Sequence, residues 1–187
     1  MNLNEKLTNI SNLCFSGGAD GADIEFGNIA NHHGHEVIHF SFDGHKSKSD
    51  VIRLYQDELE IADQYVKEAN KKIKRSFPTK SKFVNNLLRR NWYQIRWTET
   101  VYAIAAIEND IVSGGTSWAV QMYLDRAKRE QFEPRCFVFD QIKNEWFIGL
   151  NEKWFPIDPP IPQGFYTGIG SRKLLPNGKL AIKMLFE

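Results

Sequence analysis

The sequence has few of the features that mark membrane, secreted or disordered proteins. No apolar run approaches the roughly 18 residues that a membrane-spanning helix needs, and the stretch from Met1 to Lys6 does not have the layout of a signal peptide. There is no low-complexity tract, and 13% of the residues are aromatic, so long disordered segments are not expected. We therefore expect a cytoplasmic protein without a membrane partner.

Cysteine and net charge are also scarce. The two cysteines, Cys14 and Cys136, both lie in apolar, strand-like runs, which favours buried thiols in a reducing compartment over a disulfide. The net charge is +1, with 24 basic and 23 acidic residues, so no strong overall field attracts nucleic acid or an anionic membrane. Of the 187 residues 42% are hydrophobic, which predicts a single domain over 1–187 with a substantial core.

A glycine pair near the N-terminus follows a short apolar run. The run Leu13–Phe15 stops before Gly17, and an apolar-periodic segment starts at Ile24, a pattern that predicts a strand, a tight loop and a helix. Glycines let the backbone come close to a ligand, and the helix start presents free N–H groups and a positive dipole end that suit an anion. The candidate ligand contacts in this loop are Ser16, Gly17, Gly18, Ala19, Asp20 and Asp23.

A second glycine pair repeats this design later in the chain. Val112 and Ser113 precede it, and a helical pattern begins at Trp118. The hydroxyls that follow the pair could both cap this helix and donate to phosphate oxygens. Two such loops suggest one ligand held between two helix N-termini, and the second set of candidates is Gly114, Gly115, Thr116 and Ser117.

Alternating strand and helix patterns predict an α/β fold, a Rossmann-like parallel sheet with helices on both faces. We expect strands at 13–15, 36–42, 100–107, 135–139 and 165–172, a small β-hairpin near 145–157, and helices at 2–10, 22–31, 50–74, 81–96, 116–129 and 179–186. Such folds bind ligands outside the carboxyl ends of their strands. The loops that follow strands therefore add His45, Gly170, Ser171 and Arg172 to the candidate ligand contacts.

Four segments together resemble the SLOG superfamily, which includes DprA-like and YpsA-like Rossmann proteins and the cytokinin-activating LOG enzymes. They are Ser-Gly-Gly-Ala-Asp-Gly-Ala-Asp at 16–23, Arg-Asn-Trp-Tyr-Gln at 90–94, Gly-Gly-Thr at 114–116 and Thr-Gly-Ile-Gly-Ser-Arg at 167–172. The resemblance implies a Rossmann-like fold that binds nucleotides or nucleotide-derived ligands. It is also what adds Arg90 and Asn91 to the candidate contacts.

Two departures from that superfamily matter. Relatives carry the Gly-Ile-Gly-Ser-Arg strand before the Ser-Gly-Gly loop, whereas here it stands at 168–172, so the order looks circularly permuted. If so, 165–172 should lie in the sheet beside Leu13–Phe15, with Ser171 and Arg172 facing the first glycine loop. LOG enzymes also have Pro-Gly-Gly-x-Gly-Thr-x-x-Glu with a catalytic glutamate, and this chain has no acid in that helical turn.

The sequence predicts that the protein binds a nucleotide or a nucleotide-derived phosphorylated ligand, as a sensor or sequestering protein. The superfamily alone suggests a setting such as phage–host conflict. The guanidinium of Arg172 has the planar fork that suits phosphate. The alternative is a nucleotide N-glycosidase or phosphoribohydrolase with Asp20 or Asp23 as the acid. DprA-like DNA binding is disfavoured by the near-neutral charge.

Histidines are concentrated between His32 and His45. The His32–His35 cluster lies at a predicted helix end and strand start, which does not give the convergent geometry of a metal site. We therefore predict no metal and no cofactor. A homodimer is left open, since members of the superfamily often pair.

Overall fold

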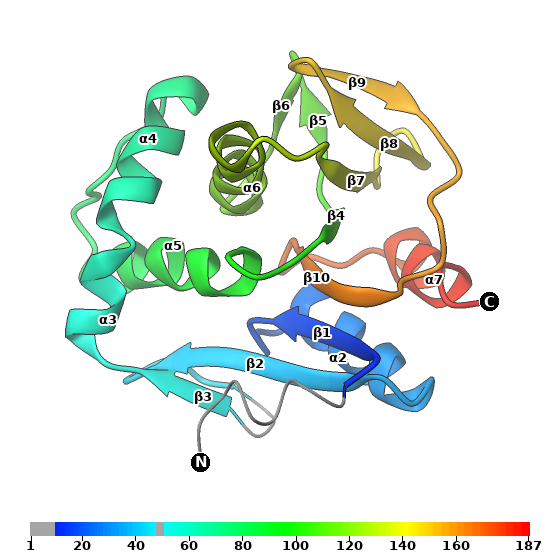
Figure 1. Ribbon diagram of the computed structural model, residues 1–187, viewed down its shortest axis with the longest axis horizontal. Coiled ribbons are helices and arrows are strands. Elements are labelled where there is room, and N and C mark those ends of the chain that lie inside the picture. The colour runs from blue at the N-terminus through cyan, green and yellow to red at the C-terminus, as the bar shows by residue number, and fades with distance from the viewer. Residues whose placement is uncertain (1–9, 48–50) are drawn as a thin grey trace.

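The computed structural model describes residues 10–47 and 51–187. Its main feature is an eight-stranded sheet in the order β3-β2-β1-β10-β4-β7-β8-β9 (Figure 1). Neighbouring strands are parallel from β3 to β7, and the last two pairs are antiparallel. The strands are β1 (Asn12–Ser16), β2 (Glu36–Phe42), β3 (Val51–Leu54), β4 (Thr100–Ile104), β7 (Arg135–Asp140), β8 (Glu145–Leu150), β9 (Lys153–Pro156) and β10 (Gly164–Gly170).

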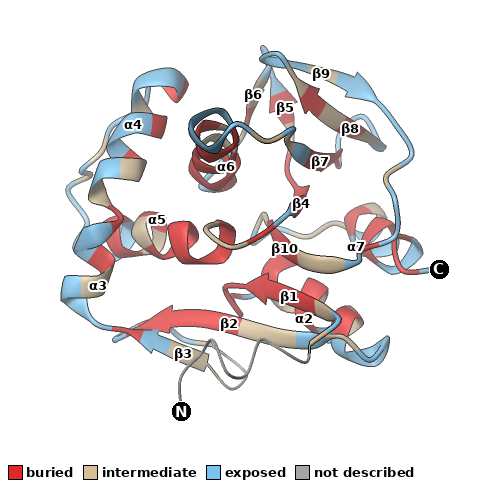
Figure 2. Ribbon diagram, in the orientation of Figure 1, coloured by how far each residue is buried: buried red, intermediate tan, exposed pale blue. Residues whose placement is uncertain are grey.

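Helices cover both faces of this sheet, as predicted. α2 and α7 pack together on one face, and α5 and α6 pack on the other, with α3 and α4 outside them. Each face has its own hydrophobic cluster, and the central strands between them are almost wholly buried (Figure 2). The helices are α2 (Ala22–His32), α3 (Gln56–Ile61), α4 (Asp63–Ile73), α5 (Lys82–Ile95), α6 (Thr116–Glu130) and α7 (Pro176–Met184). The Rossmann-like α/β prediction is confirmed.

The late strand β10 lies in the middle of the sheet. It pairs in parallel with β1, where Leu13 is opposite Phe165, and with β4 on its other side. The prediction that 165–172 lies beside Leu13–Phe15 is therefore confirmed. The chain leaves β1 toward β2 and leaves β4 toward β7, so the direction of winding reverses across β10.

Both cysteines are buried free thiols, as predicted. Cys14 lies in β1 and Cys136 in β7, and both side chains are fully shielded from solvent. Burial raises the pKa of Cys14 to about 12, so this thiol stays protonated and unreactive.

The predicted long helix 50–74 is wrong at Val51–Leu54, and its helical remainder is divided into α3 and α4. Val51 and Ile52 belong to β3, which extends the sheet beyond β2, because β-branched residues suit a pleated edge better than a helix. Tyr55 then adopts an extended conformation, and its N–H donates to the Glu58 side chain at 2.7 Å, which starts α3. Ala62 separates α3 from α4.

Smaller differences concern strand ends. The predicted strand 100–107 stops at Ile104, and its last residue belongs to a two-stranded sheet of β5 (Ile107–Glu108) and β6 (Ile111–Val112). The hairpin near 145–157 is confirmed, and β8 joins it to the main sheet by pairing with β7. The predicted helix 2–10 lies outside the described residues, apart from Ile10, which is not helical.

Candidate functional site

The parallel strands bring five loops to one edge of the sheet. β1, β2, β10, β4 and β7 all end at this edge, so the segments that follow them lie along it (Figure 1). The first glycine loop follows β1, His45 follows β2, and Ser171 and Arg172 follow β10. Residues separated by more than 150 positions in the chain thus become neighbours.

The backbone after β10 packs directly on the first glycine loop. The N–H of Ala22 donates to the Ser171 carbonyl at 3.0 Å. Gly21 has a φ of 102°, and a Cβ there would lie 2.4 Å from the Ser171 oxygen, so this position requires glycine. Residues 171 and 172 therefore lie beside this loop as predicted, although the contacts are at Gly21 and Ala22 and not at Gly17 and Gly18.

A buried ion pair lies beneath this junction. Arg90 of α5 and Asp23 of α2 are each 4% exposed, and Nη1 of Arg90 donates to Oδ2 of Asp23 at 3.1 Å. The Gly170 N–H donates to the other Asp23 oxygen at 2.9 Å, and Gln94 accepts from Arg90 at 2.7 Å. Burial lowers the pKa of Arg90, and Asp23 opposes that shift. The pair therefore joins α2, α5 and β10 at one point.

The first loop is closed by contacts within the chain. Ser16, Gly17, Gly18 and Ala19 are buried, whereas Asp20 is exposed. The N–H of Ile24 donates to Ala19 at 3.1 Å, and the hydroxyl of Ser16 donates to the Asp23 carbonyl at 2.7 Å. Together with the Ala22 bond to Ser171, these contacts occupy two amides at the start of α2. These two amides of the α2 N-terminus therefore stabilise the fold and are not open to a ligand.

The second loop is more open. Gly114 and Gly115 are exposed, and no heavy atom lies within 4 Å of a Cβ placed at either one. Its carbonyls are held: Gly114 accepts from Arg75 at 2.7 Å and from the Ser117 hydroxyl at 2.8 Å. The N–H groups of Gly115 and Thr116 make no hydrogen bond with the described residues. Thr116 and Ser117 themselves are buried at the start of α6.

Consecutive residues of α5 link the two loops. Arg90 reaches the first loop, and Nδ2 of Asn91 donates to the Gly115 carbonyl of the second at 3.3 Å. A Cβ on Gly17 would lie 1.2 Å from Nη1 of Arg90, so the guanidinium rests against that glycine. The structure thus places both predicted loops next to one turn of one helix.

His45 and Arg172 complete the cluster. His45 is 6% exposed, its Nδ1 lies 2.9 Å from the Ser41 hydroxyl, and its ring stacks on Phe42. Burial first, and then the positive charges of Arg90 and Arg172, lower the pKa of His45 to about 4, with Asp23 opposing. Arg172 is exposed, and its guanidinium makes no hydrogen bond or ion pair within residues 10–47 and 51–187. The cluster therefore contains two guanidinium groups and a buried carboxylate beside an imidazole that is neutral at neutral pH.

The low pKa of His45 can be measured. We expect its imidazole to titrate near pH 4 instead of the ordinary 6.5, and to shift upward in Arg172→Ala, because a nearby positive charge is lost. The unfolded state binds this proton near pH 6.5 and the folded state near pH 4, so stability contributed by His45 grows as the pH rises through that window. NMR titration, with the signal assigned through a His45→Gln variant, gives the value; an ordinary pKa would contradict this account.

Several residues of the cluster were not predicted. Gln94 lies four residues after Arg90 on α5 and accepts a hydrogen bond from it. Helical spacing within the Arg-Asn-Trp-Tyr-Gln segment could therefore have identified Gln94. Ser47 donates to the Gly18 carbonyl at 3.3 Å, and the buried Nδ1 of His39 has no hydrogen-bond partner in the part of the chain that the structure describes. Burial lowers the pKa of His39. No local pattern distinguishes these two residues from ordinary polar ones.

The histidines at 32–35 pack around the end of the chain. The rings of His33 and His35 contact Phe186, and Nδ1 of His35 lies 2.7 Å from the Tyr166 hydroxyl. Within the described ranges, no three histidine, cysteine, aspartate or glutamate side chains are grouped to hold a metal. No helix in the described part of the chain is both long and apolar enough to cross a membrane.

Comparisons with known proteins show a shared fold. No protein-family model matches the chain, and no curated protein matches it by sequence. The fold is similar to the crystal structure named "Putative molybdenum carrier protein" from Syntrophus aciditrophicus SB, with a TM-score of 0.51 and 11% identity over 94% of each chain. The similarity thus spans almost the whole chain, and at this identity it concerns the fold.

Proposed function

We propose that the protein binds a small nucleotide or nucleotide-derived phosphorylated ligand at the carboxyl edge of its parallel sheet, as a sensor or sequestering protein. The observation that carries this proposal is the exposed guanidinium of Arg172, which has no hydrogen bond or ion pair among the described residues, beside buried Arg90 and neutral His45. The cluster lies where the strand winding reverses, the usual ligand position in doubly wound folds.

Different parts of the site have different roles in this proposal. Arg172 pairs with a phosphate through its planar fork. The N–H groups of Gly115 and Thr116, at the positive end of α6, bind a further anionic oxygen. In this proposal His45 and Asp20 contact the uncharged hydroxyls and base of the ligand. The buried pair of Arg90 and Asp23 positions the loops around it.

The SLOG resemblance supports a nucleotide as the ligand, and the central place of β10 is what the permuted order would require. The name of the structural neighbour points to another oxyanion. Molybdate offers tetrahedral anionic oxygens, as phosphate does, and therefore belongs in the ligand panel.

Hydrolysis of the ligand is the rival function. Asp23 is buried and bonded to Arg90 and Gly170, so it is poorly placed to move a proton, and the acid would have to be Asp20. We therefore favour binding over N-glycosidic cleavage. Incubation with nucleoside monophosphates, followed by detection of free base, separates the two functions.

Arg172→Ala should weaken ligand binding by about 1.5–3 kcal/mol, the scale of a hydrogen bond to a charged group, which is roughly a 10- to 150-fold rise in Kd. The unfolding midpoint should change little, because the side chain is exposed. Titration calorimetry with mono-, di- and cyclic nucleotides, ADP-ribose derivatives and molybdate measures the Kd.

Lys173→Ala is the matched control, since it removes the adjacent exposed positive charge. It should leave Kd within about twofold. Normal binding by Arg172→Ala, or no binding by any of these ligands at millimolar concentration, would argue strongly against this site.

A further inference from the structure

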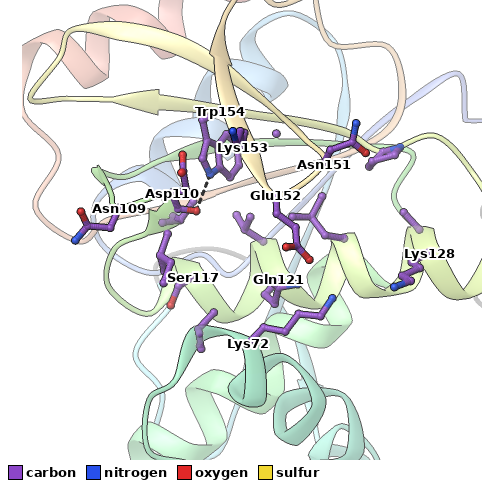
Figure 3. Close-up of a pocket in the computed structure, with 18 of the residues that line it drawn as sticks. Lys72, Asn109, Asp110, Ser117, Gln121, Lys128, Asn151, Glu152, Lys153 and Trp154 are labelled. Atoms are coloured by element: carbon purple, nitrogen blue, oxygen red, sulfur yellow. Dashed lines mark hydrogen bonds between the residues drawn. The ribbon is translucent and has the colours of Figure 1, made fainter.

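A cavity of about 770 Å³ lies away from the cluster just described, between α4, α6 and the β8–β9 hairpin (Figure 3). Its volume is in the range of small-molecule pockets, roughly 300–1,000 Å³. Of all the candidate ligand contacts, only Ser117 also lines this cavity. It therefore constitutes a separate space with its own chemistry.

The floor of the cavity is apolar. Val120, Leu124 and Ala127 line it from α6, and they recur at helical spacing along one stripe. Ile73 from the end of α4 and Val112 from β6 extend this apolar surface. Transfer of an apolar ring system from water onto this floor would lower the free energy of the system.

Trp154 forms a fixed aromatic wall. Its indole lies against Gly149 of β8, where a Cβ would be only 2.9–3.3 Å from three ring carbons. Its Nε1–H donates to the Asp110 carbonyl at 3.1 Å, shown as a dashed line in Figure 3. Two anchors hold the ring, so little side-chain entropy would be lost when a flat ligand packs on it.

The rim is rich in lysine. Five lysines line the cavity against two acidic residues, Asp110 and Glu152; the lysines are Lys71, Lys72, Lys74, Lys128 and Lys153. Only Lys72 has an ion pair with a described residue, and that partner is Asp125 at 2.6 Å. The other four ammonium groups are available to an anion, and their field favours negative charge on whatever enters.

Asp125 positions two polar groups that line the cavity. Its side chain is 4% exposed, and its Oδ1 accepts from Lys72 and, at 2.9 Å, from Nε2 of Gln121. Figure 3 shows Lys72 and Gln121 close together beneath the hairpin, with Glu152 extending from the turn toward α6. The cavity thus combines an apolar floor, an aromatic wall and a positively charged rim.

We propose that this cavity binds a small organic anion with a flat apolar body. The body packs between Trp154 and the apolar stripe of α6, and the anionic group lies among Lys71, Lys74, Lys128 and Lys153. This site is independent of the proposed function at the sheet edge.

A pair of dyes tests the proposal. 8-Anilinonaphthalene-1-sulfonate carries an anionic group on an aromatic body, and N-phenyl-1-naphthylamine is nearly the same body without the charge. We expect fluorescence titration to show at least tenfold tighter binding of the sulfonate. Near-UV circular dichroism confirms that each variant tested is folded.

Variants locate the binding. The double variant Lys74→Gln, Lys128→Gln should raise the Kd of the sulfonate at least fivefold and change the Kd of the neutral dye less than twofold. The double variant Lys80→Gln, Lys82→Gln makes the same charge change outside the cavity and should change neither Kd. Arg172→Ala should leave both dyes unaffected. Equal binding of the two dyes, or equal effects of the two lysine pairs, overturns the proposal.

Discussion

Asp23→Asn should destabilise the protein by about 3–5 kcal/mol, the cost of removing one partner from a buried ion pair. The substitution leaves the Arg90 guanidinium 4% exposed with no opposing charge among its described contacts. It also weakens the acceptor for the Gly170 N–H, the bond that ties α2 to β10. Because the pair joins three elements, the loss should appear as a lower midpoint in both urea and thermal unfolding.

The neighbouring arginine provides a matched control. Arg89 pairs with Asp63 at 2.6 Å, and the two side chains are 13% and 26% exposed. Water screens this pair more than the buried one, so Asp63→Asn should cost about 1 kcal/mol or less. Equal losses in the two variants would show that burial does not set the contribution of the Arg90–Asp23 pair. If Asp23→Asn had the same free energy of unfolding as the unaltered protein, Asp23 would not have the structural role assigned to it and would remain only a candidate ligand contact.

Gly17→Ala should also destabilise the protein strongly, by about 3 kcal/mol, although it adds only one methyl group. That methyl would lie 1.2 Å from Nη1 of Arg90 and 2.4 Å from Oδ2 of Asp23. The guanidinium must move, and it has no other buried carboxylate among its described partners, so the substitution amounts to breaking the ion pair. Chemical denaturation measures the loss.

Gly115→Ala is the control from the second loop. Gly115 has a φ of −65°, and a Cβ there would have no heavy atom within 4 Å. The free energy of unfolding of the Gly115→Ala variant should therefore change by less than about 1 kcal/mol. A double-mutant cycle tests the cause at Gly17. If displacement of Arg90 explains the loss, Gly17→Ala should cost little once Arg90 is already alanine. Additive losses would refute that explanation.

These predictions give the two glycine loops different roles, although they look alike in sequence. Both are small-residue turns before a helix, and local pattern assigns both to a ligand. In the structure the first packs against Arg90 and Ser171, whereas the second leaves Gly114 and Gly115 exposed. The difference arises because Arg90 and the backbone after β10, both distant in the chain, pack against the first loop, whereas the contact of α5 with the second loop is the Asn91 bond to the Gly115 carbonyl.

A similar limit explains the error at Val51–Leu54, the strand that was predicted as the start of a helix. The apolar residues there satisfy a helical period, but Val51 and Ile52 are held in the sheet by pairing with β2. A short amphipathic run fits both periods, and the partner strand decides between them. The predicted strand 100–107 is too long for the same reason, because Ile107 pairs with Val112 in the two-stranded sheet and not with the main sheet.

The sequence by itself determined the architecture and the edge of the sheet that carries the polar loops. Alternating strand and helix patterns require parallel strands, and the apolar segment 165–170 needed partners on both sides, which β1 and β4 supply. Only the tertiary structure decided that Asp23 and Arg90 form a buried pair, that His45 loses its basicity, and that lysines gather around a cavity beside Trp154. Those properties depend on burial and on charges from distant segments, whereas strand and helix patterns depend on neighbours along the chain.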